Sequence, residues 1–482
     1  MASINDMKDR AMHVEGSTKP EDDVAAGTIA ASTTVIERRI TRKTDWRLVP
    51  ILAALYTISL IDRTNLGGAR ISGIDQDIGL DIGNRYSVVV LVFYVSYVFF
   101  ELPSNILLKK FGAANWLGFL GLAFGLVTIG IGLSKNYATL VVLRVMLGTM
   151  EAGIFPGCIY LISSWYRRYE VSKRIAFFFT ISSFLSAFAN IMAYGFTQIS
   201  SQPERHGWKW IFIVQGSITC AIAILTKLIV IDFPESKRNK FLAPEEKDIL
   251  ISRLVQERGE AEGGKITPAV LKEVAKKWHA WALAFIYMGG STGLYGILFF
   301  LPLILRKGLG YSQVASFCLT APPAAFGLLC SLAISWASDK YRVRGPFVIL
   351  SCSLGIVGFA MTGFLTAPTP RYVGAFLGQA GTTSLIPISL AWGQNNIQGD
   401  AQKSVMSIIQ VFNAGVGGIY SALVFRQQDA PAYIPGLAAS GALLLAGALL
   451  TVVCSFIFWR ANKKADRGEL VIDGNAEFRY TW

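Results

Sequence analysis

Charged residues are scarce in this chain. Of its 482 residues only 16% are charged, whereas 52% are hydrophobic. Soluble domains carry about 25% charged residues, so this composition excludes an ordinary water-soluble fold. The net charge of +13 raises the question of nucleic-acid binding. The basic residues, however, gather in the short segments between apolar runs, and we expect no nucleic-acid partner.

Histidine and clustered cysteine are lacking as well. The three histidines, His13, His206 and His279, lie outside the centres of the apolar runs, and no nucleophile and base set accompanies them. The six cysteines form neither a CxxC motif nor a Cys/His cluster. These absences argue against an enzyme, a disulfide framework and a metal site.

Long apolar runs are what the chain does contain. Runs of about 18 to 25 residues recur along it, and each is long enough to cross about 30 Å of hydrocarbon as a helix. The predicted spans cover residues 46–68, 86–108, 113–133, 138–163, 173–198, 208–231, 280–305, 312–337, 346–366, 371–393, 404–426 and 436–459. The expected fold class is therefore an all-α membrane protein with twelve transmembrane helices.

Basic residues alternate between successive loops in a pattern that predicts orientation. If the amino terminus is cytoplasmic, that side holds most loop lysines and arginines, whereas the opposite loops hold scattered ones such as Lys135 and Arg371. Both termini are thus predicted to be cytoplasmic. No sorting signal stands out; the plasma membrane is the default location, and vacuolar and mitochondrial membranes are the alternatives.

The longest connection divides the chain into two sets of six spans. The predicted regions are a disordered cytoplasmic tail (1–44), a first six-helix half (45–231), a cytoplasmic central loop (232–278), a second six-helix half (279–460) and a second cytoplasmic tail (461–482). Two such halves, with substrate held between them at the midplane, work by alternating access as one half rocks against the other. A unit of this kind can function as a monomer in the bilayer.

Four charged residues fall inside apolar surroundings. Asp62 and Arg63 follow a long apolar run in the first span, and Arg144 and Glu151 lie seven residues apart in the fourth. A separation of seven residues returns a helix to within roughly 20° of the same face, so we expect Arg144 and Glu151 to face one cavity. Intramembrane charges cost several kcal/mol unless paired or hydrated and mark substrate or proton paths.

This constellation predicts a proton-coupled transporter of a small organic anion. Asp62 and Glu151 are the expected proton carriers, Arg63 the ligand of a substrate carboxylate, and Arg144 the residue that controls the acids. No cofactor is expected, since a proton gradient supplies the driving force. The alternative is a structural ion-pair network that pins the first span to the fourth.

Weaker candidates surround this set. Asn190, Tyr295 and Asn413 are polar positions in spans and are predicted to contact substrate, although hydrogen bonding between helices is an equal alternative. Glu101, at the inner end of the second span, is predicted to belong to a gate. So are Asp339 and Arg344, in the short basic loop of the second half that corresponds to Lys109–Gly112 in the first.

Several motifs resemble the anion:cation symporter family of the major facilitator superfamily. They are Asp62-Arg-Thr-Asn65, Arg144-Val-Met-Leu-Gly-Thr-Met-Glu-Ala-Gly-Ile-Phe-Pro-Gly157, Ser164-Trp-Tyr-Arg-Arg168 with Lys173-Arg174, and Asp232-Phe-Pro-Glu235. Trp392-Gly-Gln-Asn-Asn396 and Asp429-Ala-Pro-Ala-Tyr433 resemble its fungal branch, which includes allantoate, nicotinate and pantothenate permeases. The resemblance spans residues 45 to 460. It implies the major facilitator fold and proton-coupled uptake of small organic anions through Asp62, Arg63, Arg144 and Glu151.

The chain departs from the family pattern at a few positions. Lys109 occupies the place of the superfamily's acidic loop residue, which is present in the second half as Asp339. Gln215 stands where the family carries a glutamate, and Asp400, Ala401 and Gln402 replace a more basic stretch. The fifth span lacks the Gly-Pro signature of drug/proton antiporters, which favours import.

Two other functions remain open at this level. An exporter of organic acids or secondary metabolites would use the same cavity in the opposite direction. A transporter-like nutrient sensor would keep the binding arginine but carry long signalling tails, and the predicted tails are short.

Overall fold

The computed structural model describes residues 20–166, 168–234, 236, 241, 243, 246, 250 and 267–482. The first half contains α2 (Pro20–Arg70), α3 (Ile74–Ile78), α4 (Arg85–Phe111), α5 (Ala113–Gly132), α6 (Tyr137–Glu151), α7 (Ile154–Trp165), α8 (Arg168–Ser186), α9 (Ala189–Thr197) and α10 (Pro203–Ile229). The second contains α12 (Pro268–Lys276), α13 (Trp278–Leu303), the π-helical turn η1 (Ile304–Gly308), α14 (Gln313–Cys318), α15 (Ala321–Tyr341), α16 (Gly345–Phe364), α17 (Pro368–Asn395), α18 (Asp400–Val424), the 3-10 turn η2 (Gln427–Asp429) and α19 (Ile434–Asp466).

Most of these helices are long and apolar enough to cross a membrane. Among the described residues 11 helical segments meet that description, and the number reaches the predicted 12 when the bent pair Arg85–Glu101 and Pro103–Phe111 is counted as one span. That pair is bent by 51°. The bend lies at Pro103, which has no N–H to donate to the preceding turn and whose ring clashes with that turn's carbonyl.

The first helix begins earlier than expected. We predicted residues 1–44 to be a disordered tail, but α2 is continuous from Pro20; residues 1–19 lie outside the described part of the chain. The sequence gives a physical reason for this correction. Proline fits the first position of a helix because the N–H that it lacks has no partner there, and the next proline in the helix is Pro50.

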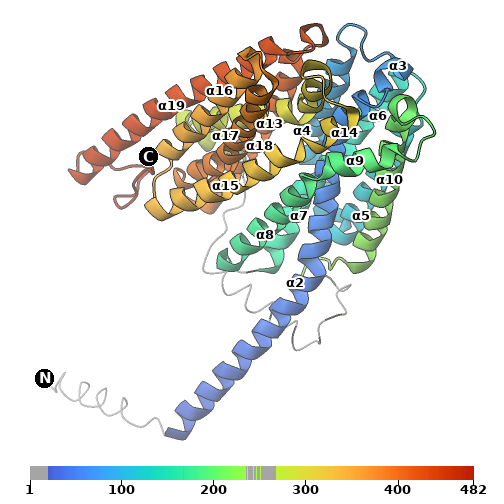
Figure 1. Ribbon diagram of the computed structural model, residues 1–482. Helices are drawn as coiled ribbons and strands as arrows, with labels where there is room; N and C mark the ends of the chain where they lie inside the picture. Colours follow the sequence, from blue (N-terminus) through green and yellow to red (C-terminus); the bar gives the residue numbers. More distant parts are fainter. Residues whose placement is uncertain are drawn as a thin grey trace, which may run out of the picture.

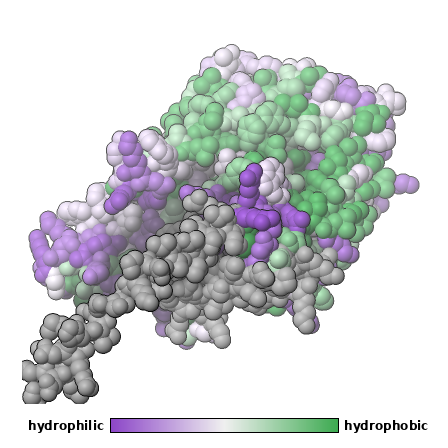
Figure 2. Space-filling view, turned by 90° about the horizontal axis from the view of Figure 1, so that it is seen from below, coloured by the Kyte–Doolittle hydropathy of each residue, from purple (hydrophilic) through white to green (hydrophobic). Residues whose placement is uncertain are grey.

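The two halves lie side by side and meet along their innermost helices. In Figure 1 the first half is blue to green and the second yellow to red, and α2 and α4 pack against α13 and α18. We call the end where α2 enters the bundle and α19 leaves it the terminal side, and the end that carries α3 and η1 the far side. Apolar (green) surface covers a broad part of the face seen in Figure 2, while hydrophilic (purple) surface gathers at the left and beside the grey residues.

Side-chain bonds between the halves gather on the far side. Two consecutive cations of η1 reach acids of the first half: Lys307 Nζ lies 3.3 Å from Asp75 Oδ2, and Arg306 Nη2 lies 3.6 Å from Glu204 Oε1. Further bonds run from the Tyr86 hydroxyl to the Phe299 carbonyl (3.3 Å), from Ser87 Oγ to the Phe425 carbonyl (3.2 Å) and from Gln313 Nε2 to the Ile71 carbonyl (3.2 Å). The far side is therefore closed by contacts that an opening motion must break.

Motifs of the first half cross-link its helices on the terminal side. Asp232 Oδ1 accepts a hydrogen bond from the backbone N–H of Ala113 (2.8 Å) at the start of α5, and Trp165 Nε1 donates to the Asp232 carbonyl (3.0 Å). Arg174 pairs with Asp45 at 2.6 Å. These residues bind helix ends to one another and lie away from the middle of the bundle.

Candidate substrate and proton-coupling site

A cavity of about 240 Å³ lies between the halves and is lined by residues of both. Among the described residues that line it, Arg63 is the only charged one. The remaining wall is largely aromatic and hydroxyl-bearing. Its tyrosines are Tyr56, Tyr94, Tyr97, Tyr287 and Tyr295. Four further neutral polar side chains of the second half, Ser291, Ser331, Gln379 and Thr383, also line it.

Arg63 is held by a buried acid that does not itself line the cavity. Its Nε and Nη2 atoms each lie 2.7 Å from the same oxygen, Oε1 of Glu151, which also accepts a 2.7 Å hydrogen bond from Ser59 Oγ. Glu151 is fully buried, and Arg63 is 8% exposed. In a pair this well shielded from water, removal of one partner leaves the other charge buried and uncompensated.

The cavity-facing side of Arg63 is surrounded by aromatic rings. Its Nη1 lies 3.4 Å from the Tyr295 hydroxyl, and its guanidinium carbon is 5.0 Å from the ring centre of Tyr97 and 5.8 Å from that of Phe93. Tyr295 belongs to α13, so the arginine of the first half already contacts the second. Of the residues predicted to bind substrate, Arg63 and Tyr295 are thus brought together on the cavity wall.

Asp62 and Arg144 lie behind this wall. Asp62 is fully buried, and its Oδ1 has long hydrogen bonds to Asn65 Nδ2 (3.4 Å) and Thr128 Oγ1 (3.5 Å). Arg144 is 2% exposed, and Asp62 is the acid whose charge interacts with it most strongly. Within the described residues, Asp62 Oδ2 and the Nε and Nη2 of Arg144 have no hydrogen-bond partner. These atoms are available to a proton or to a new partner after rearrangement.

The expected arrangement of the four charges needs one correction. We predicted that Arg144 and Glu151 face one cavity together, with Arg144 between the acids. In the structure both are buried on α6 and neither lines the cavity. Glu151 pairs with Arg63 instead of Arg144. The cause is the side-chain reach of Arg63, which crosses from α2 to α6; spacing along one helix says nothing about a partner on another.

Comparison with known proteins places this architecture in a family. The pattern described as Major Facilitator Superfamily matches residues 52–422. The chain belongs to the major facilitator superfamily. Among solved structures it is similar to the xylose transporter XylE from E. coli, with a TM-score of 0.68 and 11% identity over 84% of this chain and 97% of that one. The predicted all-α major facilitator fold is therefore confirmed, and these proteins are transporters and not enzymes.

Similar curated proteins of the superfamily are fungal. The MFS transporter prlL of a fungal species is 30% identical over 97% of this chain and 95% of its own length. The high-affinity nicotinic acid transporter of Saccharomyces cerevisiae is 29% identical over 93% of this chain and 85% of its own length. The resemblance to a fungal branch of the superfamily agrees with these relatives.

Two predicted substrate ligands of this superfamily member do not line the cavity. Asn190 donates from Nδ2 to Thr320 Oγ1 (2.9 Å) and so joins α9 to the second half. Asn413 donates to the carbonyl of Ile409 (2.8 Å), one turn earlier on its own helix. In this conformation Asn190 makes a bond from its helix to the second half, which is the alternative that the sequence left open, and its Oδ1 is buried without a hydrogen-bond partner among the described residues. Asn413 bonds only within its own helix.

The predicted gating residues lie on the terminal side. Asp339 and Arg344 form an ion pair of 2.5 Å across the α15–α16 connection, and Arg344 Nη1 also donates to Ser338 Oγ (3.1 Å). Glu101 is half-buried at the bend of α4, directly before the proline region. All three therefore occupy helix ends or bends, where a rocking motion changes contacts.

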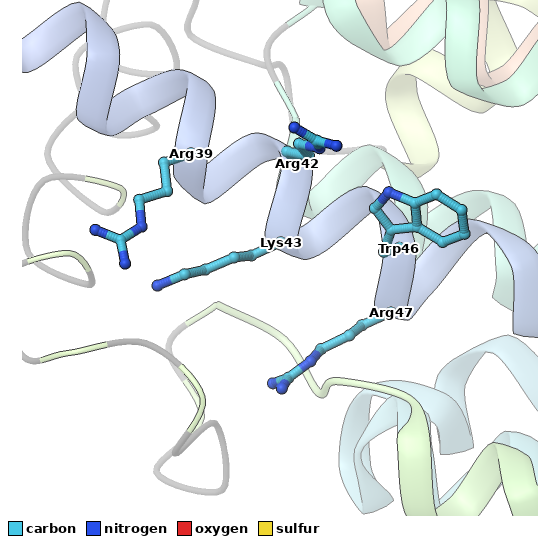
Figure 3. Close-up of a pocket in the computed structure, with 5 residues that line it drawn as sticks. All are labelled: Arg39, Arg42, Lys43, Trp46 and Arg47. Atoms are coloured by element: carbon cyan, nitrogen blue, oxygen red, sulfur yellow. The ribbon is translucent and has the colours of Figure 1, made fainter.

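A larger pocket elsewhere in the molecule does not fit the substrate role. Figure 3 shows this pocket of about 590 Å³ on α2, where Arg39, Lys43 and Arg47 extend from one side of the helix. Lys43 pairs with Glu246 at 2.8 Å, and Arg47 stacks on Phe241. The pocket thus lies at the terminal end of the span, against the central connection, and outside the space between the halves.

Most of the aromatic residues that line the cavity were not predicted from the sequence. Tyr94 and Tyr97 line the cavity from α4, and the Tyr94 ring centre is 4.8 Å from that of Tyr295. The Tyr94 hydroxyl is buried without a hydrogen-bond partner in the described part of the chain. The only signal available was the run Phe93–Phe100, in which the aromatic residues recur too densely to single out one helix face.

Proposed function

We propose that this protein is a proton-coupled symporter of a small organic monoanion, with an aromatic monocarboxylate as its first candidate substrate. One observation carries the proposal: the single cation on the described cavity wall, Arg63, is occupied by a buried carboxylate, Glu151. A substrate carboxylate must compete with Glu151 for the same donors. Binding of the anion is then linked to proton uptake by the acid that it displaces.

The order of events follows from charge balance. A proton on Glu151 removes the negative charge that holds Arg63, and the freed guanidinium binds the incoming carboxylate with two N–H groups. Proton and anion together leave the net charge of the site unchanged, so the halves close around a neutral pair. Release on the other side reverses both steps and restores the pair between Arg63 and Glu151. Asp62 and Arg144 act beside this exchange as a second proton site and its charge partner.

The aromatic wall supports the proposed substrate class. Five tyrosines bind a planar apolar body more favourably than a strongly hydrated one. Ser331, Gln379 and Thr383 add neutral hydrogen bonds on the side contributed by the second half. A second carboxylate would find no cation among the described lining residues. The similarity to a nicotinic acid transporter makes nicotinate the first compound to test.

The test is uptake of labelled nicotinate by liposomes that contain the purified protein. With the interior more alkaline than the exterior, we expect accumulation above the outside concentration and its collapse when a protonophore removes the gradient. A panel of monocarboxylates, dicarboxylates, ureides and vitamins should compete in proportion to their fit, with dicarboxylates weakest. Uptake that is indifferent to the pH gradient for every transported compound would refute proton coupling. Accumulation only under the opposite gradient would indicate export by antiport.

A further inference from the structure

The last residues of the chain form an extended segment that is bound by side chains of the second half. Two asparagines on different helices each pair with one backbone unit of this segment. Asn462 of α19 accepts from the N–H of Tyr480 (2.8 Å) and donates to its carbonyl (2.7 Å). Asn396, at the end of α17, accepts from the N–H of Thr481 (2.7 Å) and donates to its carbonyl (3.0 Å).

These two carboxamides recognise the segment as a neighbouring β-strand would. Each offers one acceptor and one donor to a single residue's N–H and C=O, so these two contacts depend on the backbone of Tyr480 and Thr481 and not on their side chains. Trp392 Nε1 donates a second hydrogen bond (2.7 Å) to the Thr481 carbonyl. Trp392 and Asn396 are both fully buried. The motif Trp392–Asn396, which the sequence only associated with a fungal branch, therefore forms a binding site for the backbone of Thr481.

Other contacts anchor the same segment to four more places. The Tyr480 ring stacks on Phe458 of α19 with ring centres 4.6 Å apart. Asp473 pairs with Lys277 at the start of α13 (2.7 Å), and the main-chain oxygen of Trp482 accepts from the N–H of Arg344 at the start of α16 (3.1 Å). Gln398 Nε2 donates to the Ile472 carbonyl (3.4 Å). The segment thus joins the terminal ends of α13, α16, α17 and α19.

One of the helices it joins contains a weak point beside the cavity. Pro387 interrupts the hydrogen-bond ladder of α17. The Thr383 carbonyl, which a residue with an N–H at position 387 would have bonded, instead accepts from Ser331 Oγ of α15 (3.3 Å). Pro387 itself lines the cavity. Helices bend at such breaks, and the part of α17 beyond Pro387, residues 388–395, is called the short rod below.

That short rod is held from two sides. Towards α18, Gln410 Nε2 donates to the Ser389 carbonyl (2.9 Å) and Gln394 Nε2 to Ser407 Oγ (2.9 Å). Towards α19, the C-terminal segment holds Trp392 and Asn396. We propose that residues 472–482 act as a strap that binds the end of α17 to α19 and thereby fixes the hinge at Pro387 and the terminal-side wall of the cavity. This proposal does not depend on the identity of the substrate.

Recognition through the backbone gives a matched pair of variants at one position. Thr481→Ala keeps the N–H and carbonyl that Asn396 binds, whereas Thr481→Pro removes the N–H and leaves Asn396 Oδ1 without its donor. The measurement is amide hydrogen exchange of the full-length purified protein, followed by mass spectrometry, in peptides that contain Tyr480 and in peptides from residues 388–396. It needs no substrate, so its outcome is separate from that of the uptake experiment.

We expect Thr481→Pro to raise exchange about tenfold or more in both segments, because the undocked strap releases the rod beyond Pro387. Thr481→Ala should exchange like the wild type. Asn396→Ala removes the side chain that binds Thr481 and should raise exchange in both segments as Thr481→Pro does. Gln394→Ala should leave Tyr480 protected. If Tyr480 loses its protection while exchange at residues 388–396 stays unchanged, the proposal that the segment holds the end of α17 is wrong. Equal release by Thr481→Ala, or full protection in Thr481→Pro, would overturn recognition through the backbone.

Discussion

The two halves share a helical plan but contribute different chemistry to the cavity. The first half supplies the buried charges Asp62, Arg63, Arg144 and Glu151. The second half supplies neutral groups to the cavity wall, among them Tyr295 and Gln379. In the proposed symport mechanism, a substrate anion and a proton are exchanged within the first half, without moving a charge between halves. The other half is then free to set shape and selectivity.

The largest effect should come from removal of the cation in the first half. Arg63→Ala is expected to lower anion uptake about 30-fold or more, since loss of one partner of a buried charge pair costs about 2–5 kcal/mol and each 1.4 kcal/mol is tenfold. Initial rates of uptake into liposomes measure this. Because the variant strands Glu151 in the interior, the double variant Arg63→Ala with Glu151→Gln provides the control. It should regain thermal stability and still fail to transport; restored uptake would show that Arg63 is structural.

The next largest effect is expected from Glu151→Gln, also in the first half, and it should separate anion binding from coupling to the proton gradient. For one proton per monoanion, a gradient of about 2 pH units supports about 100-fold accumulation. Glu151→Gln cannot lose a proton, and we expect it to accumulate substrate no more than about twofold. The amide still leaves Arg63 able to bind the anion, so exchange of labelled for unlabelled substrate without a gradient should persist. If the variant accumulates substrate as the wild type does, Glu151 is not the coupling acid, and Asp62→Asn becomes the decisive variant.

A smaller effect is expected in the second half, and it should change selectivity alone. Gln379→Ala removes a neutral hydrogen-bonding group from the wall, worth about 0.5–1.5 kcal/mol, and should change KM about 2- to 10-fold in a manner that differs between substrates. The accumulation ratio should stay as in the wild type. Asn413→Ala is the matched control, since Asn413 is an amide of the same half that bonds to its own helix. A loss of accumulation in Gln379→Ala would break the division between the halves.

The smallest effect concerns the ion pairs that join the halves on the far side. Lys307 is 42% exposed at its side chain, and exposed pairs contribute about 0–1 kcal/mol. Lys307→Gln should therefore favour far-side opening by less than about fivefold. The rate at which an impermeant maleimide labels Ser72→Cys, a buried far-side position, measures this opening. Asp75→Asn should act in the same direction, and slower labelling in either variant would contradict the assignment of a closing contact.

Prediction from the sequence succeeded where one residue's surroundings along the chain were enough. Asp62, Arg63, Arg144 and Glu151 stand in long apolar runs, and each is buried in the structure. The sequence did not assign their partners: the pair Arg63 and Glu151 joins the first span to the fourth, as the structural alternative allowed, through side chains 88 positions apart. Asn190 and Asn413 show the same limit. A polar residue in a span faces either a cavity or another helix, and the rotation of the helix decides which.

The sequence by itself determined the membrane architecture. Apolar runs of sufficient length must form helices in hydrocarbon, since each backbone polar group needs a partner within its own segment. Tertiary structure alone decided which acid holds Arg63, which tyrosines form the cavity wall, and that Trp392 and Asn396 receive the chain's own last residues. Those outcomes depend on contacts between helices that are distant in the chain, and such contacts are set by the packing of whole helix faces. Local pattern fixes which residues are buried, and packing fixes what they meet.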